Sequence, residues 1–96
     1  MSETVNKDLI RSFIISGKVQ GVFFRDSTQR IARTLNIIGS ATNQFDGTVK
    51  VIAKGNDESL AQLHQWLHVG PELAMVKNVD EVDIDQHLQL NEFIIA

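Results

Sequence analysis

Segments with the apolar pattern of a β-strand alternate along the chain with segments that have the apolar spacing of an α-helix. The order of these segments constrains the fold more than any other feature. Runs rich in β-branched and aromatic side chains, typical of strands, occupy residues 9–16, 37–43, 48–54, 76–84 and 91–96. Apolar side chains at helical spacing mark two helices, one at residues 24–35 and one around Leu60, Leu63 and Leu67. The chain therefore reads strand, helix, strand, strand, helix, strand, with one further strand.

This order predicts an α+β fold, a ferredoxin-like split βαβ sandwich (βαββαβ) with two helices on one face of an antiparallel or mixed sheet. The first strand is apolar on both phases, so we expect it inside the sheet, and we expect Gly17 to end it. Asp46-Gly47 is a strong turn signal, so the second and third strands should form a hairpin. We expect residues 1–7 to be a flexible tail and residues 8–96 to form a single domain.

Polar residues mark the expected ends of the helices. Asn36 follows the first helix, where a left-handed residue is common, and Asn56 or Asp57 should cap the start of the second helix. In the fourth strand the apolar period changes phase between Val79 and Val82, which predicts a β-bulge between them.

Composition and charge narrow the classes of function. The chain has no cysteine, which removes disulfides, thiolate metal sites and thiol nucleophiles, and we expect a cytoplasmic protein. No apolar run approaches the ~20 residues of a membrane span. The formal net charge is −3 and the basic residues are scattered, so we expect neither nucleic acid nor a membrane as a partner. We expect a monomer that binds a small molecule, for which one local positive pocket is enough.

The segment GKVQGVFFR, residues 17–25, connects the first strand to the first helix. Backbone N–H groups from Gln20, Gly21, Val22, Phe23 and Phe24 can converge on one point, and the helix N-terminus adds unpaired donors. Arg25 in the first helical turn adds a planar cation suited to phosphate or carboxylate. By these properties alone, an anion site and a simple turn with a surface ion pair are equally good interpretations. The spacing is not that of a Walker loop.

The segment ATNQFDGTV, residues 41–49, places Asn43 at the end of a strand, just before a turn. A side-chain amide there can donate and accept hydrogen bonds at once, so it can orient a water molecule. Taken alone, this asparagine is better explained as a residue that caps the turn through its own backbone.

Together, GKVQGVFFR, GSATNQFDGTV and GPELAMV resemble the acylphosphatase family over about residues 9–95. The resemblance implies an enzyme that hydrolyses the carboxyl–phosphate anhydride of acyl phosphates to carboxylate and inorganic phosphate, without cofactor, metal or covalent intermediate. It implies that Arg25 and the backbone of residues 20–24 bind the phosphate, and that Asn43 places the attacking water. Ser40 stands where the family has an aromatic residue, and Thr42 where it often has a basic one.

Physical chemistry is consistent with so small a set of catalytic residues. A carboxylate is a good leaving group, so the protein mainly has to neutralise charge and align a water molecule. Asn43 does not take up a proton at neutral pH, so its role would be positional. We expect Asp26 to point to another side of the helix from Arg25, which leaves no nucleophile for a phospho-enzyme.

Two other interpretations remain open. The same fold can serve as a non-catalytic phosphate-binding or regulatory module. An open sheet face can bind RNA, but Phe13 is the one aromatic candidate on the first strand.

His64 and His68 have the i, i+4 spacing of metal ligands, but with no third ligand nearby we expect a solvated helix edge.

Overall fold

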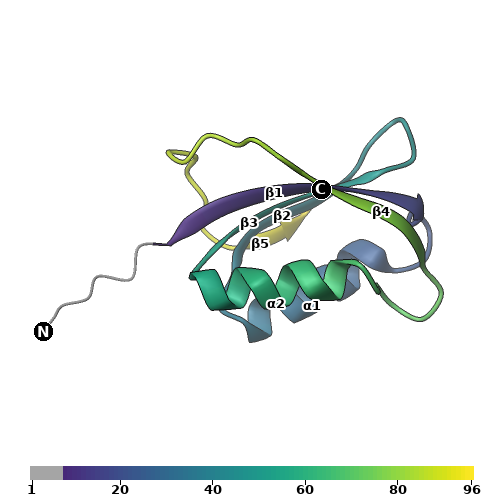
Figure 1. Cartoon of the computed structure of the whole chain (residues 1–96), viewed down its shortest axis with the longest axis horizontal. Coiled ribbons are helices and arrows are strands. Elements are labelled where there is room, and N and C mark those ends of the chain that lie inside the picture. Colours follow the sequence, from purple (N-terminus) through teal and green to yellow (C-terminus); the bar gives the residue numbers. More distant parts are fainter. Residues whose placement is uncertain (1–7) are drawn as a thin grey trace, which may run out of the picture.

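The computed structural model describes residues 8–96, and the tail expected at residues 1–7 lies outside them. The elements, in chain order, are β1 (Leu9–Lys18), α1 (Phe24–Thr34), β2 (Ile38–Asn43), β3 (Val49–Gly55), α2 (Asp57–Leu67), β4 (Met75–Val82) and β5 (Phe93–Ile95). Both helices lie on the same side of the sheet (Figure 1). The predicted order of elements is confirmed.

The strands form one five-stranded sheet in the order β4-β1-β3-β2-β5. β1 pairs antiparallel with both β3 and β4, and β2 pairs antiparallel with β3, so the first strand is inside the sheet as expected. The further strand, β5, adds to the β2 edge in parallel and makes the sheet mixed. This is the ferredoxin-like α+β sandwich that the sequence predicts, extended by one edge strand.

Two sequence expectations about strand ends and bulges are wrong. β1 continues through Gly17 to Lys18, and the register shifts at Ser16/Gly17, opposite Val76 and Asn78. A Cβ at Gly17 would collide with the Met75 carbonyl oxygen, so this glycine permits close strand pairing and does not end the strand.

The pairing from Val79 to Val82 is continuous, so the predicted bulge is not there. The period changes phase because Val79 packs against the core on the helix side, whereas Val82 points to the opposite face of the sheet. The bulge lies at Lys77, the one residue without a partner between the paired residues Val76 and Asn78.

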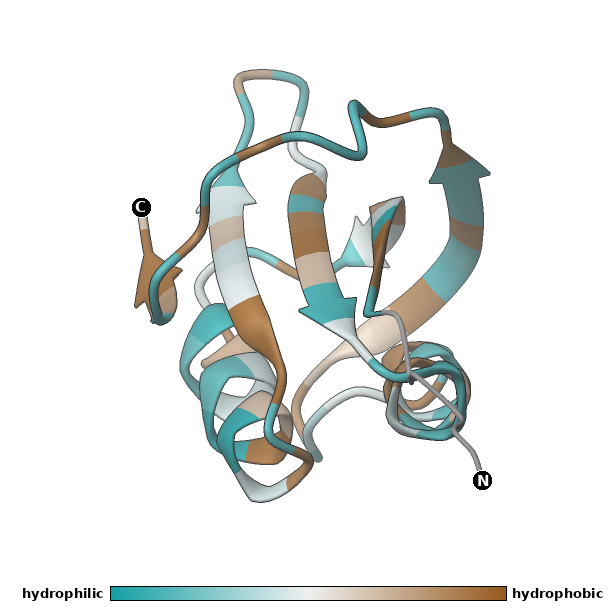
Figure 2. Cartoon of the chain, turned by 90° about the vertical axis from the view of Figure 1, so that its left-hand side faces the viewer, coloured by the Kyte–Doolittle hydropathy of each residue, from teal (hydrophilic) through white to brown (hydrophobic). Residues whose placement is uncertain are grey.

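The hydrophobic core lies between the sheet and the two helices. α1 buries Phe24, Thr28 and Ala32, and α2 buries the three leucines that the sequence analysis assigned to its core face. On the other face of the sheet, the connection between β4 and β5 crosses over the strands (Figure 2). The side chain of Gln86 holds this connection, since it bonds to both the N–H and the carbonyl oxygen of Ile10.

The predicted helix boundaries are close to those observed. Asn36, after α1, has the left-handed φ of 57° that its position suggested. Asn56 is the N-cap of α2, and its side-chain oxygen accepts a hydrogen bond from the Ser59 N–H at 2.8 Å. Both asparagines follow from local chemistry, which explains why the sequence located them.

Candidate active site

The loop between β1 and α1 has an unusual backbone. Gly21 and Phe23 both have left-handed φ, at 73° and 65°, whereas Val22 between them has no positive φ. Alternation of this kind turns successive N–H groups toward one side of a loop and forms an anion-binding concavity. Phe23 is also the N-cap of α1, so the unpaired donors and positive dipole end of the helix begin at the same place.

Arg25 lies in the first turn of α1, and its side chain extends toward the edge of the sheet. Its Nη1 donates a hydrogen bond to the backbone oxygen of Ala96 at 2.8 Å. Ala96 is itself held by its N–H, which donates to the Ala41 carbonyl oxygen on β2 at 2.9 Å. The guanidinium is therefore positioned by the backbone that continues β5, an acceptor that the sequence analysis did not identify.

Asn43 is the last residue of β2, and its side-chain Oδ1 is buried. No hydrogen-bond donor reaches this oxygen from residues 8–96. A buried acceptor without a partner is unfavourable by about 1–3 kcal/mol, so this oxygen has the capacity to accept a hydrogen bond from a donor outside the chain.

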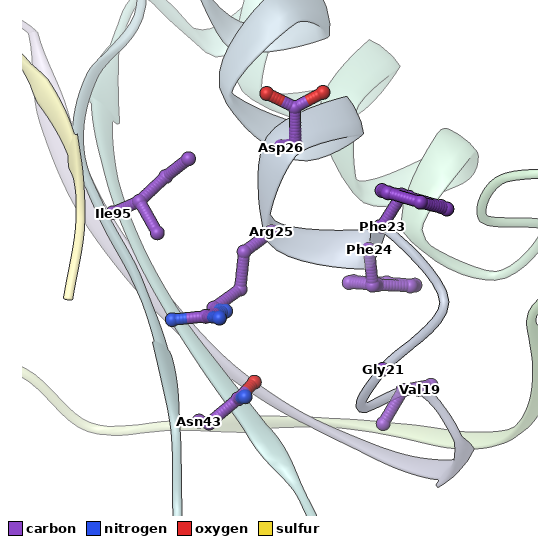
Figure 3. A pocket seen from close by; sticks show the side chains of 8 residues that line it. All are labelled: Val19, Gly21, Phe23, Phe24, Arg25, Asp26, Asn43 and Ile95. Carbon is purple, nitrogen blue, oxygen red and sulfur yellow. The ribbon is translucent and has the colours of Figure 1, made fainter.

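A pocket of about 290 Å³ joins these elements. It is lined by Val19, Gly21, Phe23, Phe24, Arg25, Asp26, Asn43 and Ile95. Figure 3 shows the Arg25 side chain leaving the helix and pointing toward Asn43 across the pocket. Arg25 and Asn43, which are 18 positions apart in the sequence, therefore line one pocket.

Some of the predicted phosphate-binding residues line the pocket, and the others lie behind it. Gly21, Phe23 and Phe24 line the pocket, whereas Gln20 and Val22 do not. Val22 is a core residue with 5% exposure. The Nε2 of Gln20 donates to the backbone oxygens of Gln44 and Thr48, both at 2.8 Å. This side chain ties the β1–α1 loop to the turn that follows Asn43, which no local pattern in the sequence could reveal.

Three residues of the pocket were not among the predicted site residues, and one of them, Val19, is a buried core residue. Ile95 reaches the pocket from β5, whose short run carries no motif. Asp26 lines the pocket, although its carboxylate is directed away from the Arg25 guanidinium, as Figure 3 shows. It pairs with Arg30 one turn along the helix at 3.0 Å. The expectation that Asp26 points to another side than Arg25 therefore holds for the carboxylate but not for the residue as a whole.

Away from the pocket, His64 belongs to a packed cluster and not to a solvated edge, which corrects the sequence expectation. Its ring stacks on buried Phe13 with centroids 4.7 Å apart, and its Nδ1 lies 3.2 Å from Arg11 Nη2. Arg11 in turn makes two hydrogen bonds to Glu81, at 2.7 and 2.8 Å. His68 is exposed, as expected.

The charged groups of this cluster shift one another's pKa values. Burial lowers the pKa of His64, and the neighbouring Arg11 cation lowers it further. The hydrogen bond from Arg11 lowers the pKa of Glu81 and, reciprocally, raises the pKa of Arg11. His64 thus accepts a hydrogen bond from Arg11 in its neutral form.

Other classes of site find little support in the part of the chain that is described. Within residues 8–96, no three His, Cys, Asp or Glu side chains are grouped as metal ligands would be. No helix in the same range is long and apolar enough to cross a membrane. Phe13, the aromatic candidate for stacking on RNA bases, is fully buried.

Comparisons with known proteins agree on one family. The family model for acylphosphatase matches residues 11–95. An acylphosphatase of Hahella chejuensis is 45% identical over 83% of this chain and 84% of its own length. An acylphosphatase of Pasteurella multocida is 39% identical over 91% of this chain and 97% of its own. The structure of an acylphosphatase from Coxiella burnetii superimposes with a TM-score of 0.86 at 34% identity, covering 94% of both chains.

Proposed function

Since the chain belongs to the acylphosphatase family and is thus an enzyme that hydrolyses acyl phosphates, we propose that Arg25, Asn43 and the β1–α1 loop perform the reaction. The observation that carries the proposal is the pocket that Arg25 and Asn43 both line, with the Arg25 side chain directed toward Asn43.

The phosphoryl group binds first, at the N-terminus of α1. Its oxygens accept hydrogen bonds from the loop N–H groups around Gly21 and Phe23, whose left-handed backbone supports such a concavity. The Arg25 guanidinium neutralises the remaining charge and makes paired hydrogen bonds that a lysine could not make. To do so it exchanges its bond to the Ala96 oxygen, wholly or in part, for the phosphate.

Water attacks from the side of Asn43. The Oδ1 accepts one proton of the water in a hydrogen bond and directs the water oxygen toward phosphorus. A bond forms between the water oxygen and phosphorus while the bond from phosphorus to the carboxyl oxygen breaks, and the carboxylate leaves with the electron pair. The water proton passes to the phosphate oxygens or to solvent, because an amide cannot hold it.

This scheme requires neither a metal ion nor a covalent intermediate. The guanidinium and the loop dipoles stabilise the charge of a loose transition state, which is most of what phosphoryl transfer demands. We therefore expect full activity in the presence of EDTA and competitive inhibition by inorganic phosphate. The cytoplasmic location, the monomeric state and the absence of nucleic-acid binding remain predictions.

The test measures acetyl phosphate hydrolysis by the wild type, Arg25→Ala and Asn43→Ala. We expect losses in kcat of ~10³-fold or more for Arg25→Ala and ~10²-fold for Asn43→Ala, the scale seen when a transition-state charge or an oriented group is removed. Arg33→Ala, an exposed arginine on the same helix, and Asn78→Ala, an exposed asparagine on β4, are matched controls that should retain full activity.

The outcome separates the proposal from its alternative. Arg25→Ala with full activity and an intact fold would contradict the assigned site. A wild-type protein that binds inorganic phosphate but turns over no acyl phosphate would instead favour the phosphate-binding or regulatory module.

A further inference from the structure

Gln29 lies on α1 one turn beyond Arg25, and its side chain reaches β5. Its Nε2 donates a hydrogen bond to the backbone oxygen of Phe93 at 2.8 Å. Arg25, four residues earlier and thus on the same face of the helix, donates to the backbone oxygen of Ala96, also at 2.8 Å. Two side chains of one helix face therefore hold two carbonyl groups of a single strand and its continuation.

The backbone of β5 has few other bonds. The strand is three residues long and lies at the edge of the sheet, and within the described residues it pairs with β2 alone. The backbone oxygen of Glu92 and the N–H of Ala96 both bond to β2. Because backbone groups alternate along a strand, those of Phe93 face the outer edge. There Gln29 provides the donor that a further strand would otherwise provide.

Packing anchors the start of β5 better than its end. The Phe93 side chain is buried, whereas Ile94 and Ile95 are 48% and 39% exposed. The Gln29 bond fixes the peptide group between Phe93 and Ile94, and this planar group sets the path of the chain to Ala96. Short segments with few buried contacts open locally at little cost, so loss of the bond should loosen the Ala96 oxygen first.

The Ala96 oxygen is in turn the acceptor for Arg25. A long arginine side chain samples many rotamers unless an acceptor fixes it. Here one N–H of the guanidinium bonds to Ala96, and the other donors stay available to the pocket that Arg25 and Asn43 line. Figure 3 shows the side chain in this orientation, beside β5 and directed toward Asn43. A guanidinium held in this way meets a phosphoryl group without a search among rotamers.

We propose that Gln29 is a positioning residue for acyl phosphate hydrolysis: it holds β5 against α1, so that the Ala96 oxygen keeps the Arg25 guanidinium directed at the phosphoryl group. The inference rests on the proposed function, in which Arg25 stabilises the charge of the transition state. Gln29 does not line the pocket, so it acts through Arg25 and not on the substrate. Interactions made chiefly in the transition state raise kcat, so loss of Gln29 should change kcat more than KM.

The experiment compares the wild type with Gln29→Leu, Arg25→Ala and the double variant, with acetyl phosphate as substrate. Gln29→Leu keeps most of the side-chain volume but lacks the donor. We expect its kcat to fall roughly tenfold, less than the ~10²-fold that a misplacement of about 1 Å can cost. KM and the inhibition constant of inorganic phosphate should rise much less. In the Arg25→Ala background the same change should lower kcat no further, because its effect passes through Arg25.

Amide hydrogen exchange reports on β5 independently of activity. The Ala96 N–H, which donates to the Ala41 oxygen, should exchange faster in Gln29→Leu than in the wild type. Gln65→Leu, at an exposed position of α2, is the matched control and should change neither exchange nor kcat. Leu63→Val, in the buried face of α2, should lower the urea midpoint but leave kcat unchanged, which separates a general loss of stability from a loss of position.

Three results would overturn the inference. The first is an unchanged kcat in Gln29→Leu, and the second is an unchanged exchange rate of the Ala96 N–H. The third is a further fall in kcat when Gln29→Leu is added to Arg25→Ala, since Gln29 would then act by another route. All three leave the proposed function standing as long as Arg25→Ala alone is inactive. Full activity of Arg25→Ala would instead refute the proposed function.

Discussion

The side-chain Nε2 of Gln20 lies 2.8 Å from the backbone oxygen of Thr48, and this hydrogen bond joins the loop before α1 to the hairpin that follows Asn43. The same nitrogen also donates to the Gln44 backbone oxygen at 2.8 Å. One amide thus fixes the distance between the two halves of the candidate active site. Arg25 comes from one half and Asn43 from the other, so their mutual geometry depends on a residue that does not line the pocket.

We therefore predict that Gln20→Leu impairs both folding and activity. The change removes two hydrogen bonds, each of about 0.5–1.5 kcal/mol, to carbonyl oxygens that keep their bonds from backbone N–H groups, so the free energy of unfolding should fall by about 1–3 kcal/mol. It also loosens Asn43 relative to Arg25, so kcat should fall more than KM rises. Urea denaturation and steady-state kinetics measure these effects. Gln62→Leu, at an exposed position of α2, is the control and should change neither.

Gly17 should not tolerate a side chain. Its φ is 119°, and a Cβ would overlap the Met75 carbonyl oxygen and lie 2.6 Å from the Lys77 nitrogen, both of them backbone atoms of β4. We expect Gly17→Ala to lower the free energy of unfolding by about 3 kcal/mol, the upper range for overpacking. Gly47→Ala has open space around it and should cost only the left-handed strain, ~1–2 kcal/mol. Equal effects of the two changes on the urea midpoint would contradict this account.

Ser40 should be a site where stability can be gained. It lines a pocket of about 270 Å³ between β2, β5 and the end of the β4–β5 connection, beside Leu90 and Ile94. Ser40→Phe should fill this space and raise the free energy of unfolding by ~1 kcal/mol, since cavity filling commonly yields ~0.5–2 kcal/mol. Ser40→Ala should give little gain, and a thermal midpoint no higher for phenylalanine than for alanine would count against the prediction.

Stability should fall as the pH drops from about 7 to about 5. The pKa of His64 is lowered in the folded state by burial and by Arg11, so in this range the unfolded chain binds the extra proton. Protonation therefore favours unfolding as the pH falls through ~6.5, the ordinary histidine value. Glu81 also has a lowered pKa, but its contribution is lost only at lower pH.

His64→Asn keeps an acceptor for Arg11 without titrating, so its urea midpoint should vary less over this range. His87→Asn is the control, because the His87 side chain is 94% exposed. If the wild type and His64→Asn lost stability in parallel, His64 would not be the group responsible.

The parts of the fold that follow from short-range chemistry could be predicted. Asn56 caps α2 and Asn36 ends α1 because their side chains and backbones satisfy needs within a few residues. The apolar spacings typical of strands and of helices predicted the order of these elements for the same reason, because each spacing is a property of neighbouring residues. The bulge was misplaced because a phase change in an apolar pattern has two causes, an extra residue or apolar side chains on both faces of the strand. Only the pairing of β4 with β1, which is continuous from Val79 to Val82, distinguishes them.

The candidate site likewise has parts that the sequence predicts and parts that only the tertiary structure determines. Arg25 and the loop before it are contiguous, so the sequence alone determined a helix N-terminus with a cation in its first turn, together with an asparagine at a strand end. The tertiary structure alone decided that these face one pocket. It also decided that Gln20 supports the pocket from outside, and that the backbone oxygen of Ala96, 71 residues away and just after β5, holds the guanidinium. Contacts across such separations depend on sheet order and register, which no local period encodes.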